Sequence, residues 1–390
     1  MQRYLQEIVK NDPHLRIDVL TIRQAEANAQ FDPTVAVNLP SAVRVHRVNP
    51  GTLYRHRFAW DLDTKILARD GWLAAAPLAA VRLGNIPWIP RGAAWIARRA
   101  RADYDGIYVF ADPLASITLG ILAASLNPRA RLVLEYGRGI PPLSAAAASL
   151  EKRALSRCAA AVVRTRATVH AYQARYPSVP PERFKILYGG VDWSDYHVAL
   201  SKTAPTTHFS IVYTGTIYAD SLSPRPFLEA VARIAKAGLY RVSVTIVGAS
   251  NPVVSREVDD LALGNVVNFA GHVGLDKIAA IQTEASLLLA IGFKSPFKIS
   301  SKLAQYAAAR VPVLYIADSP DDPGASLVSQ SGRGLVAPND VVAIESAINH
   351  VRRLTNDHKL PERFDLSDSG QFSWQQIATE IATLLTDGND

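Results

Sequence analysis

The side chains of this sequence that best suit chemistry lie in three short turns of its second half. Each turn follows an apolar run and combines glycine with hydroxyl or basic groups: Gly215, Thr216 and Arg225; Gly271 and His272; Lys298, Ser300, Ser301 and Lys302. A glycine lets an anion approach the backbone closely, and the start of a helix offers N–H donors and a partial positive charge. Lysine and hydroxyl groups add charge-assisted hydrogen bonds. The pattern predicts a diphosphate site.

Each of these turns has a simpler explanation when it is taken alone. A glycine after a strand is usually just a turn, and Ser300 and Ser301 before a helix are usually capping residues. His272 by itself is more often a turn residue than a ligand. Three such turns in one half of the chain, all at strand ends, favour the site over the separate explanations.

The first half offers one further pair of candidate residues. Glu135 and Arg138 lie in the segment LVLEYGRGIPP, directly after an apolar run. We expect them to contact an acceptor or a donor sugar, and we name them as the candidate catalytic residues. A turn that holds a local Glu–Arg pair is an equally simple interpretation.

Several familiar chemistries are missing from the sequence. It contains no GxGxxG, no Walker loop, no HExxH, no paired CxxC and no GxSxG, which argues against dehydrogenases, nucleotide hydrolases and α/β-hydrolases. The nine histidines are scattered, so we expect no metal. The single cysteine, Cys158, cannot form an internal disulfide and is expected in the core.

Short apolar runs alternate with helical patterns along most of the 390 residues. Continuous rather than alternating apolar strands are typical of parallel sheets covered by helices on both faces. We predict two doubly wound α/β domains facing a cleft, at residues 1–195 and 196–368, with a last helix at 369–390. Strands are expected at 17–22, 43–48, 107–110, 132–135, 160–163, 184–187, 210–213, 242–247, 266–270, 287–291, 313–316 and 334–336, and helices at 226–237, 276–285, 301–309 and 341–351.

The order of several segments resembles glycosyltransferase family 4, whose members have the GT-B fold. The second half carries, in the order of the family, IVYTGTIY, VTIVGAS, VVNFAGHVGLDKIAAI, SKLAQYAAARVPVLYI and FSWQQIATEIATLL. The first half carries KILYGGVD, in which Gly189 stands where the family usually has Asn. The final helix is similar to the one that crosses back onto the first domain in GT-B enzymes.

The resemblance implies retaining transfer of a sugar from a nucleoside-diphosphate donor, with no cofactor and no metal. The donor would bind the second domain and the acceptor the first. The resemblance places Gly215 and Thr216 at the diphosphate, with Arg225 as a basic partner, and His272 near the nucleotide. Lys298, Ser300, Ser301 and Lys302 would lie near the phosphates or the sugar. Gln305 stands where the family places the second Glu of its E-x7-E pair, and Phe297 stands in the place of the first.

One departure concerns the start of the chain. The family begins with a strand and a glycine-rich turn, whereas this sequence opens in what resembles the first helix, QRYLQEIVKN. We therefore expect the first strand of the N-terminal domain to be missing. An open sheet is destabilised and prone to association, so the 390-residue chain is expected to be weakly active.

Charge separates the two halves of the chain. Residues 1–200 hold 26 Lys and Arg against 16 Asp and Glu, a net charge of +10, although the whole chain carries only +7. The segment from Trp88 to Arg101 mixes tryptophan with arginine, a combination that suits a membrane interface. A core helix with a basic solvated face explains it equally well. The longest uncharged apolar runs, 71–81 and 116–126, have 11 residues, against the ~20 needed to cross a bilayer.

These observations lead to one functional prediction with two alternatives. We predict a retaining glycosyltransferase that extends a glycan or a lipid-linked acceptor in bacterial polysaccharide or glycolipid synthesis. It is expected in the cytoplasm, at the inner face of the plasma membrane, and without nucleic acid as a partner. A nucleotide-sugar epimerase, or a non-catalytic subunit that keeps the GT-B fold, are the alternatives.

Overall fold

The fold is described from a computed structural model of the chain. The described residues are 2–22, 39–49, 88–100, 102–111, 114–137, 145–197, 208–217, 221–249, 251–319, 321–367, 370 and 372–386. The chain divides into two compact units. The first comprises Met1–Arg164, Val169–Leu187 and Gln375–Asp390, and the second comprises Thr165–Thr168 and Tyr188–Trp374. Each unit is described by itself.

The second unit is built around a six-stranded sheet in which every pairing is parallel. The strand order is β12-β11-β10-β7-β8-β9, so the direction of the chain across the sheet reverses between β7 and β10. In such sheets, ligands bind beyond the carboxyl ends of the strands at this reversal. The strands are β7 (His208–Thr214), β8 (Arg241–Val247), β9 (Val267–Gly271), β10 (Leu287–Ile291), β11 (Val313–Ala317) and β12 (Gly334–Pro338).

Helices cover both faces of this sheet. Ile211 and Tyr213 of β7 point to one face, where they pack with apolar residues of α10, α11 and α15. Val212 points to the other face and packs with α12, α13 and α14. This alternation is the period-two pattern of a strand buried on both sides. The helices are α9 (Ser194–His197), α10 (Arg225–Ala237), α11 (Pro252–Asp260), α12 (Leu275–Thr283), α13 (Lys302–Ala308), α14 (Pro323–Gln330), α15 (Val341–Asn356) and α16 (Leu360–Arg363).

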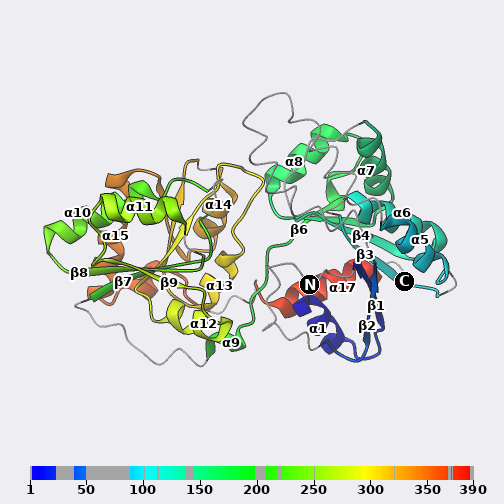
Figure 1. Cartoon of the computed structure of the whole chain (residues 1–390), viewed down its shortest axis with the longest axis horizontal. Coiled ribbons are helices and arrows are strands. Elements are labelled where there is room, and N and C mark those ends of the chain that lie inside the picture. The colour runs from blue at the N-terminus through cyan, green and yellow to red at the C-terminus, as the bar shows by residue number, and fades with distance from the viewer. Residues whose placement is uncertain are drawn as a thin grey trace. The chain divides into compact units, whose positions relative to one another are not determined.

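The first unit holds a parallel pair, β1 and β2, and a four-stranded parallel sheet of order β3-β4-β5-β6. Helices α5, α6 and α7 contact one another in that order beside the larger sheet (Figure 1). The strands are β1 (Ile17–Ile22), β2 (Val43–Val48), β3 (Gly106–Phe110), β4 (Arg131–Glu135), β5 (Ala160–Val163) and β6 (Phe184–Ile186). The helices are α1 (Gln2–Asn11), α5 (Ile89–Ala97), α6 (Leu114–Leu126), α7 (Ala145–Arg157), α8 (Arg166–Arg175), the 3-10 turn Pro181–Arg183 and α17 (Trp374–Thr386).

The last helix, α17, packs almost entirely within the first unit. Arg131 Nε donates a hydrogen bond of 2.9 Å to the carbonyl oxygen of Leu384, and Asn11 Nδ2 donates one of 3.0 Å to Thr379 Oγ1. A Cβ on Gly106 would lie 2.8 Å from the Leu385 side chain. The amino end of β3 therefore needs a glycine, because any larger side chain would push the helix away.

The predicted strands are confirmed at all twelve positions, with ends that differ by at most two residues. The four predicted helices are confirmed as α10, α12, α13 and α15, the last of which extends to Asn356. The absence of a first strand stays a prediction. The sequence therefore predicts the elements well, because each is a continuous apolar run or a helical pattern bounded by glycine or proline.

One helix end allows a clean test of local geometry. Helix α11 ends in a Schellman motif, in which Leu263 N donates to Val258 O (2.9 Å) and Ala262 N donates to Asp259 O (3.0 Å). Ala262 has φ of +53° and an exposed methyl group.

Replacing Ala262 by Gly should raise the free energy of unfolding by about 1 kcal/mol, because the left-handed conformation strains alanine but not glycine. Urea unfolding followed by circular dichroism measures the change. The same substitution at exposed Ala237, the last residue of α10, is the control and should destabilise the protein, because glycine has a lower helix propensity than alanine. Destabilisation by both substitutions would contradict the expectation.

Candidate functional site

A pocket of about 280 Å³ lies in the second unit, at the carboxyl ends of β7 and β10. This is the point at which the strand order reverses. The pocket is lined by Tyr213, Thr214, Gly215, Thr216, Ser221, Ile278, Ile291, Phe293, Ile299, Ser300, Ser301, Lys302 and Gln305. Its walls mix apolar side chains with hydroxyl groups and one amine, the composition expected of a small-molecule site.

Gly215 forms the floor of the turn after β7. Its φ is +111°, a conformation that residues with a Cβ rarely adopt, and its N–H donates to Val247 O (2.7 Å). A Cβ at Gly215 would lie 3.3 Å from Lys302 Nζ. Gly248, at φ +137°, supports this turn from β8, because its own Cβ would lie 2.6 Å from Gly215 O. Both glycines are needed to bring the backbone and the amine together.

Lys302 supplies the positive charge of the pocket. Its Nζ lies 3.7 Å from the centre of the Tyr213 ring, a cation–π contact. Burial lowers the pKa of the Lys302 amine to about 7. The structure shows no ion pair for this amine among the described residues. A bound anion would therefore favour the protonated form and gain a charge-assisted contact.

A buried hydrogen-bond network holds the elements behind the pocket. Tyr306 Oη accepts a hydrogen bond from Thr214 N (3.0 Å) and donates one to Leu289 O (3.0 Å). Gln282 Nε2 donates to Thr214 Oγ1 (2.8 Å), and Tyr196 Oη donates to Gln282 Oε1 (2.6 Å). These bonds join β7, β10, α12 and α13, so the pocket is built on fixed supports. None of these residues was predicted from the sequence. The signal that could have indicated them is a polar side chain within an otherwise apolar helix.

The structure brings together six of the nine predicted donor residues. Gly215, Thr216, Ser300, Ser301, Lys302 and Gln305 all line the pocket. Ser301 precedes α13 but makes no side-chain capping bond, so its hydroxyl is not used to cap the helix. Tyr213, Ser221, Ile278 and Phe293 also line the pocket and were not predicted.

Three predicted donor residues do not line this pocket. Arg225 is exposed at the start of α10, where its Nε donates to Glu229 Oε1 (2.8 Å). His272 is exposed after β9, and Lys298 is exposed with its Nζ 5.9 Å from the centre of the Phe293 ring. Helix periodicity explains the difference at Arg225, because Glu229 lies one turn along α10 and forms an i,i+4 ion pair with it.

Glu135 lies at the carboxyl end of β4 and is 1% exposed. Tyr108 Oη donates a hydrogen bond of 2.5 Å to its Oε2, and Arg164 forms an ion pair with its Oε1. Arg164 also donates to Leu187 O (2.7 Å). Glu135 is thus paired, but with a residue of the next strand, so its charge ties together the ends of all four strands of the sheet. Arg138 lies outside the described residues.

The segment from Trp88 to Arg101 contains the core helix α5. Trp88 and Ile96 are 8% and 7% exposed and pack with Ala115 and Leu119. Trp95 is half-buried and lies under the guanidinium of Arg99, 4.2 Å from its ring centre. The apolar side of the helix therefore faces the core, because burying Trp88 and Ile96 removes their apolar surface from water.

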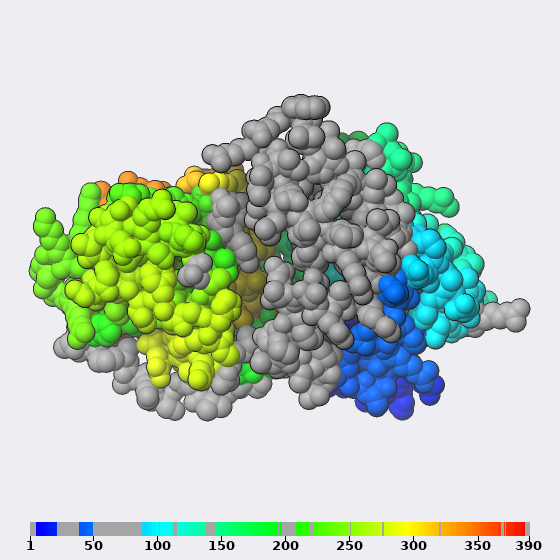
Figure 2. Space-filling model, viewed as in Figure 1, coloured from blue at the N-terminus to red at the C-terminus, as the bar shows by residue number. Residues whose placement is uncertain are grey.

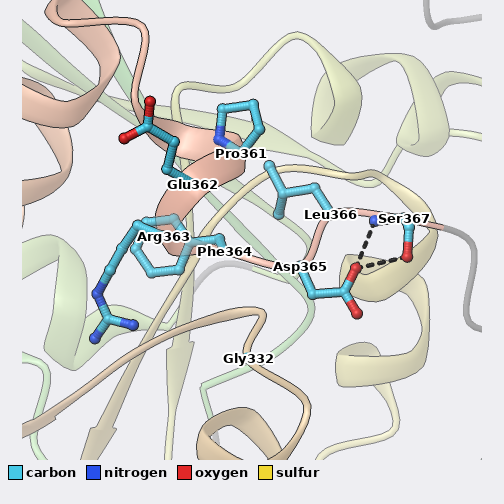
Figure 3. A pocket seen from close by; sticks show the side chains of 8 residues that line it. All are labelled: Gly332, Pro361, Glu362, Arg363, Phe364, Asp365, Leu366 and Ser367. Atoms are coloured by element: carbon cyan, nitrogen blue, oxygen red, sulfur yellow. Dashed lines mark hydrogen bonds between the residues drawn. The ribbon is translucent and has the colours of Figure 1, made fainter.

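A second hollow, of about 620 Å³, lies in the segment that follows α16 (Figure 3). It is lined by Gly332 and by residues 361–367. The Asp365 carboxylate there accepts hydrogen bonds from the backbone and hydroxyl of Ser367 (3.0 and 2.5 Å). Asp365 is exposed and its carboxylate serves a local turn, and Glu362 and Arg363 are exposed as well. The hollow therefore offers no buried polar group, and the smaller pocket is the candidate site.

Neither a metal-binding cluster nor a membrane-spanning helix occurs among the described residues. Across the ranges given above, no group of three or more His, Cys, Asp or Glu side chains is placed to hold a metal ion. Within those same ranges, no helix combines the length and the apolar character needed to cross a membrane.

Part of the second unit is similar to a known family of proteins. Residues 208–354 match the family described as glycosyl transferases group 1. HepE from Anabaena, crystallised with UDP, is 16% identical, covers 95% of this chain and 100% of its own, and has a TM-score of 0.57. Sucrose-phosphate synthase from Thermosynechococcus elongatus is also similar: it is 16% identical, the match covers 97% of this chain and 90% of that one, and the TM-score is 0.58. A glycosyltransferase from Rickettsia africae is 11% identical, the match covers 100% of this chain and 94% of that one, and the TM-score is 0.65. No curated protein matches. The structural likeness shows a GT-B fold.

The Lys302 amine should make stability depend on pH. The folded chain releases this proton near pH 7, whereas the unfolded chain keeps it until about 10.4. The unfolded state therefore binds more protons between these values, and stability contributed by this group rises with pH across the window. The gain in unfolding free energy from Lys302→Met should be largest near pH 7 and shrink toward pH 10. Lys236→Met, at an exposed position of α10, is the control; a gain from Lys302→Met that does not change with pH would contradict the expectation.

Removing Arg164 should leave the Glu135 charge buried without a partner. We expect Arg164→Met to lower the free energy of unfolding by about 3 kcal/mol. The double variant Glu135→Gln with Arg164→Met should recover part of the loss, because no buried charge then remains. Urea unfolding of the two single variants and the double variant gives the coupling, with Arg166→Met at an exposed position as control. Simple additivity of the two single losses would argue against the pair.

Proposed function

We propose that this chain, which matches the group 1 glycosyl transferases over residues 208–354 and shares the GT-B fold, is a glycosyltransferase. The protein transfers a sugar from a nucleoside-diphosphate donor to a glycan or lipid-linked acceptor, with retention at the anomeric carbon. The observation that carries the proposal is the meeting of Lys302 with the Gly215 turn at the strand reversal. Bacterial polysaccharide or glycolipid synthesis is the proposed setting.

The pocket suits a diphosphate in charge and in shape. Lys302 is a half-buried lysine whose pKa is lowered by burial, so an anion would favour its charged form, and the absence of a side chain at Gly215 lets a phosphate reach the backbone. Hydroxyl groups of Thr216, Ser300 and Ser301 line the same pocket and supply further donors. HepE, which shares the fold, was crystallised with UDP and with UDP-glucose, so uridine diphosphate is the first nucleotide to test.

The chemistry asks the protein chiefly to hold charge. When the sugar leaves, negative charge develops on the diphosphate, and a preorganised ammonium and N–H groups stabilise it. Lys302 would supply the ammonium, and Gln305, whose amide can both donate and accept, would bind hydroxyl groups of the donor. No metal and no further cofactor enter the proposed reaction.

On the acceptor side, Glu135 and Arg138 keep a proposed role. Both oxygens of Glu135 are occupied by Tyr108 and Arg164, so Glu135 would act by positioning Arg164 rather than by touching the sugar. The carboxyl ends of β4, β5 and β6 are thereby held in one arrangement. Arg138 would contact the acceptor from the segment that follows β4.

Among the alternatives, transfer is favoured over epimerisation. An epimerase needs an acid and a base close to the sugar, and the titratable side chains that line the pocket are Tyr213 and Lys302, which contact each other. A non-catalytic subunit would keep the same nucleotide site. Turnover of the donor separates it from the enzyme.

Binding of nucleoside diphosphates to the purified chain tests the donor site. Titration calorimetry with UDP, GDP and ADP should give selective binding of one diphosphate. Lys302→Ala should weaken that binding by about 10- to 100-fold, because it removes a charge-assisted hydrogen bond.

Lys298→Ala is the matched control, since Lys298 is an exposed lysine of the same segment that does not line the pocket. It should leave affinity within about twofold. Equal losses in the two variants, or no binding of any diphosphate, would contradict the donor site. Binding without release of nucleotide from any sugar donor, across a panel of glycan and lipid-linked acceptors, would support the non-catalytic subunit.

A further inference from the structure

We propose that the outer face of helices α5, α6 and α7 binds the surface of an anionic lipid bilayer. We call this surface the basic face and define it by Arg91, Arg98, Lys152, Arg153 and Arg157. All five side chains are exposed. The surface belongs to the first unit and its charge is independent of the donor pocket, so the inference goes beyond the proposed sugar transfer.

The three helices present their exposed residues at regular helical spacing. Arg91 and Arg98 are two turns apart at α5, and between them Ala94 is also exposed. In α7 the exposed positions are 145–146, then Ser149, then 152–153, then 156–157, again about one turn apart. The buried positions of both helices face inward, so the basic residues lie on the outer side of each. Cyan atoms of this part of the chain reach the surface in Figure 2.

The basic face carries positive charge without exposed acidic neighbours on its helices. Helix α6 has no charged residue, and α5 has no acidic one. The one acid of α7 is Glu151, which is 3% exposed and accepts a hydrogen bond from Tyr176 Oη (2.7 Å). Arg175 lies 3.6 Å from the same carboxylate and balances its charge. The nearest exposed acids in sequence are in the loop 103–105 that follows α5.

Helices of the second unit show a different pattern. There, Arg225 pairs with Glu229 at 2.8 Å, and Arg233 pairs with Glu345 at 3.7 Å. Mixed charges of this kind are typical of a solvated surface. The structure shows no such pair for the five arginine and lysine side chains of the basic face among the described residues. The five residues of the basic face are part of the excess of positive charge in the first half of the sequence.

Binding through this face is electrostatic and superficial. The tryptophan that would insert into a membrane, Trp88, packs into the core with Ile96 instead. Leu126, at the end of α6, is the one large apolar residue of these three helices that is 36% exposed or more among their described side chains. Lys and Arg side chains are attracted to an anionic bilayer, and salt screens that attraction.

The arrangement favours a bilayer over a nucleic acid. The charges lie on α5 and α7, on either side of an uncharged helix, and so spread over a layer rather than along a line of phosphates. Proteins that bind single-stranded nucleic acids without sequence preference also use exposed aromatic rings, on which the bases stack. Trp88 is buried and Trp95 is covered by Arg99, so neither ring is open to a base.

Sedimentation with lipid vesicles tests the proposal on the full chain. Vesicles of phosphatidylcholine alone are compared with vesicles that contain 30% phosphatidylglycerol, at about 50 mM and 500 mM salt. We expect binding to the anionic vesicles at low salt only. The double charge reversal Lys152→Glu with Arg153→Glu should weaken it at least tenfold.

The matched control is Lys236→Glu with Arg241→Glu, two exposed basic residues of the second unit, which should leave binding within twofold. Circular dichroism and urea unfolding check that both variants fold. Equal binding to neutral vesicles, equal losses in both variants, or no binding would overturn the proposal. Tighter binding of a 20-nucleotide single strand that displaces the vesicles would assign the face to nucleic acid. Calorimetry with UDP on the Lys152 and Arg153 variant keeps a failure here distinct from a failure of the donor site.

Discussion

The candidate site depends on one buried hydroxyl, that of Tyr306. It accepts a hydrogen bond from the backbone of Thr214 at the end of β7 and donates one to Leu289 in β10. A tyrosine on the first turns of α13 therefore satisfies polar groups of two neighbouring strands, where an unpaired group would be costly. Because Lys302 is on the same short helix, this contact also fixes the amine above the Gly215 turn. Without this contact, α13 would not be held in the position that places Lys302 beside Gly215.

The two units solve the problem of buried charge in different ways. In the first unit Glu135 forms an ion pair with Arg164, which also donates a hydrogen bond to the carbonyl oxygen of Leu187 at the end of β6. In the second unit Lys302 has a cation–π contact and a lowered pKa but no carboxylate partner among the described residues. A satisfied pair stabilises a sheet edge, whereas an unsatisfied amine is ready for an anionic ligand. This contrast supports the proposed anion-binding role of Lys302 and the proposed positioning role of Glu135.

Charge also divides the outer surfaces. Arginines of α10 pair with glutamates on their own or neighbouring helices, whereas the exposed charged residues of α5 and α7 are all basic and α6 has no charged residue. Such a surface attracts anions over distances of about a Debye length, whatever chemistry occurs in the pocket. Donor binding and surface attachment are therefore physically separable in this protein.

The sequence by itself determined the elements and indicated six of the residues that line the pocket. Apolar runs gave strands such as Leu287–Ile291 to the residue, and Gly215 and Lys302 were identifiable because a diphosphate needs a bare backbone and an amine at a helix start. These signals are local, so neighbouring residues suffice to read them. Only the tertiary structure decided which distant groups meet. Tyr306 contacts Thr214, 92 residues away in the sequence, and Glu135 contacts Arg164, 29 residues away. Arg225 pairs with Glu229 and does not line the pocket, and Trp88 packs into the core. These partners depend on the packing of the whole chain, because a buried polar group needs a hydrogen-bond partner and only the complete fold determines which groups are buried together.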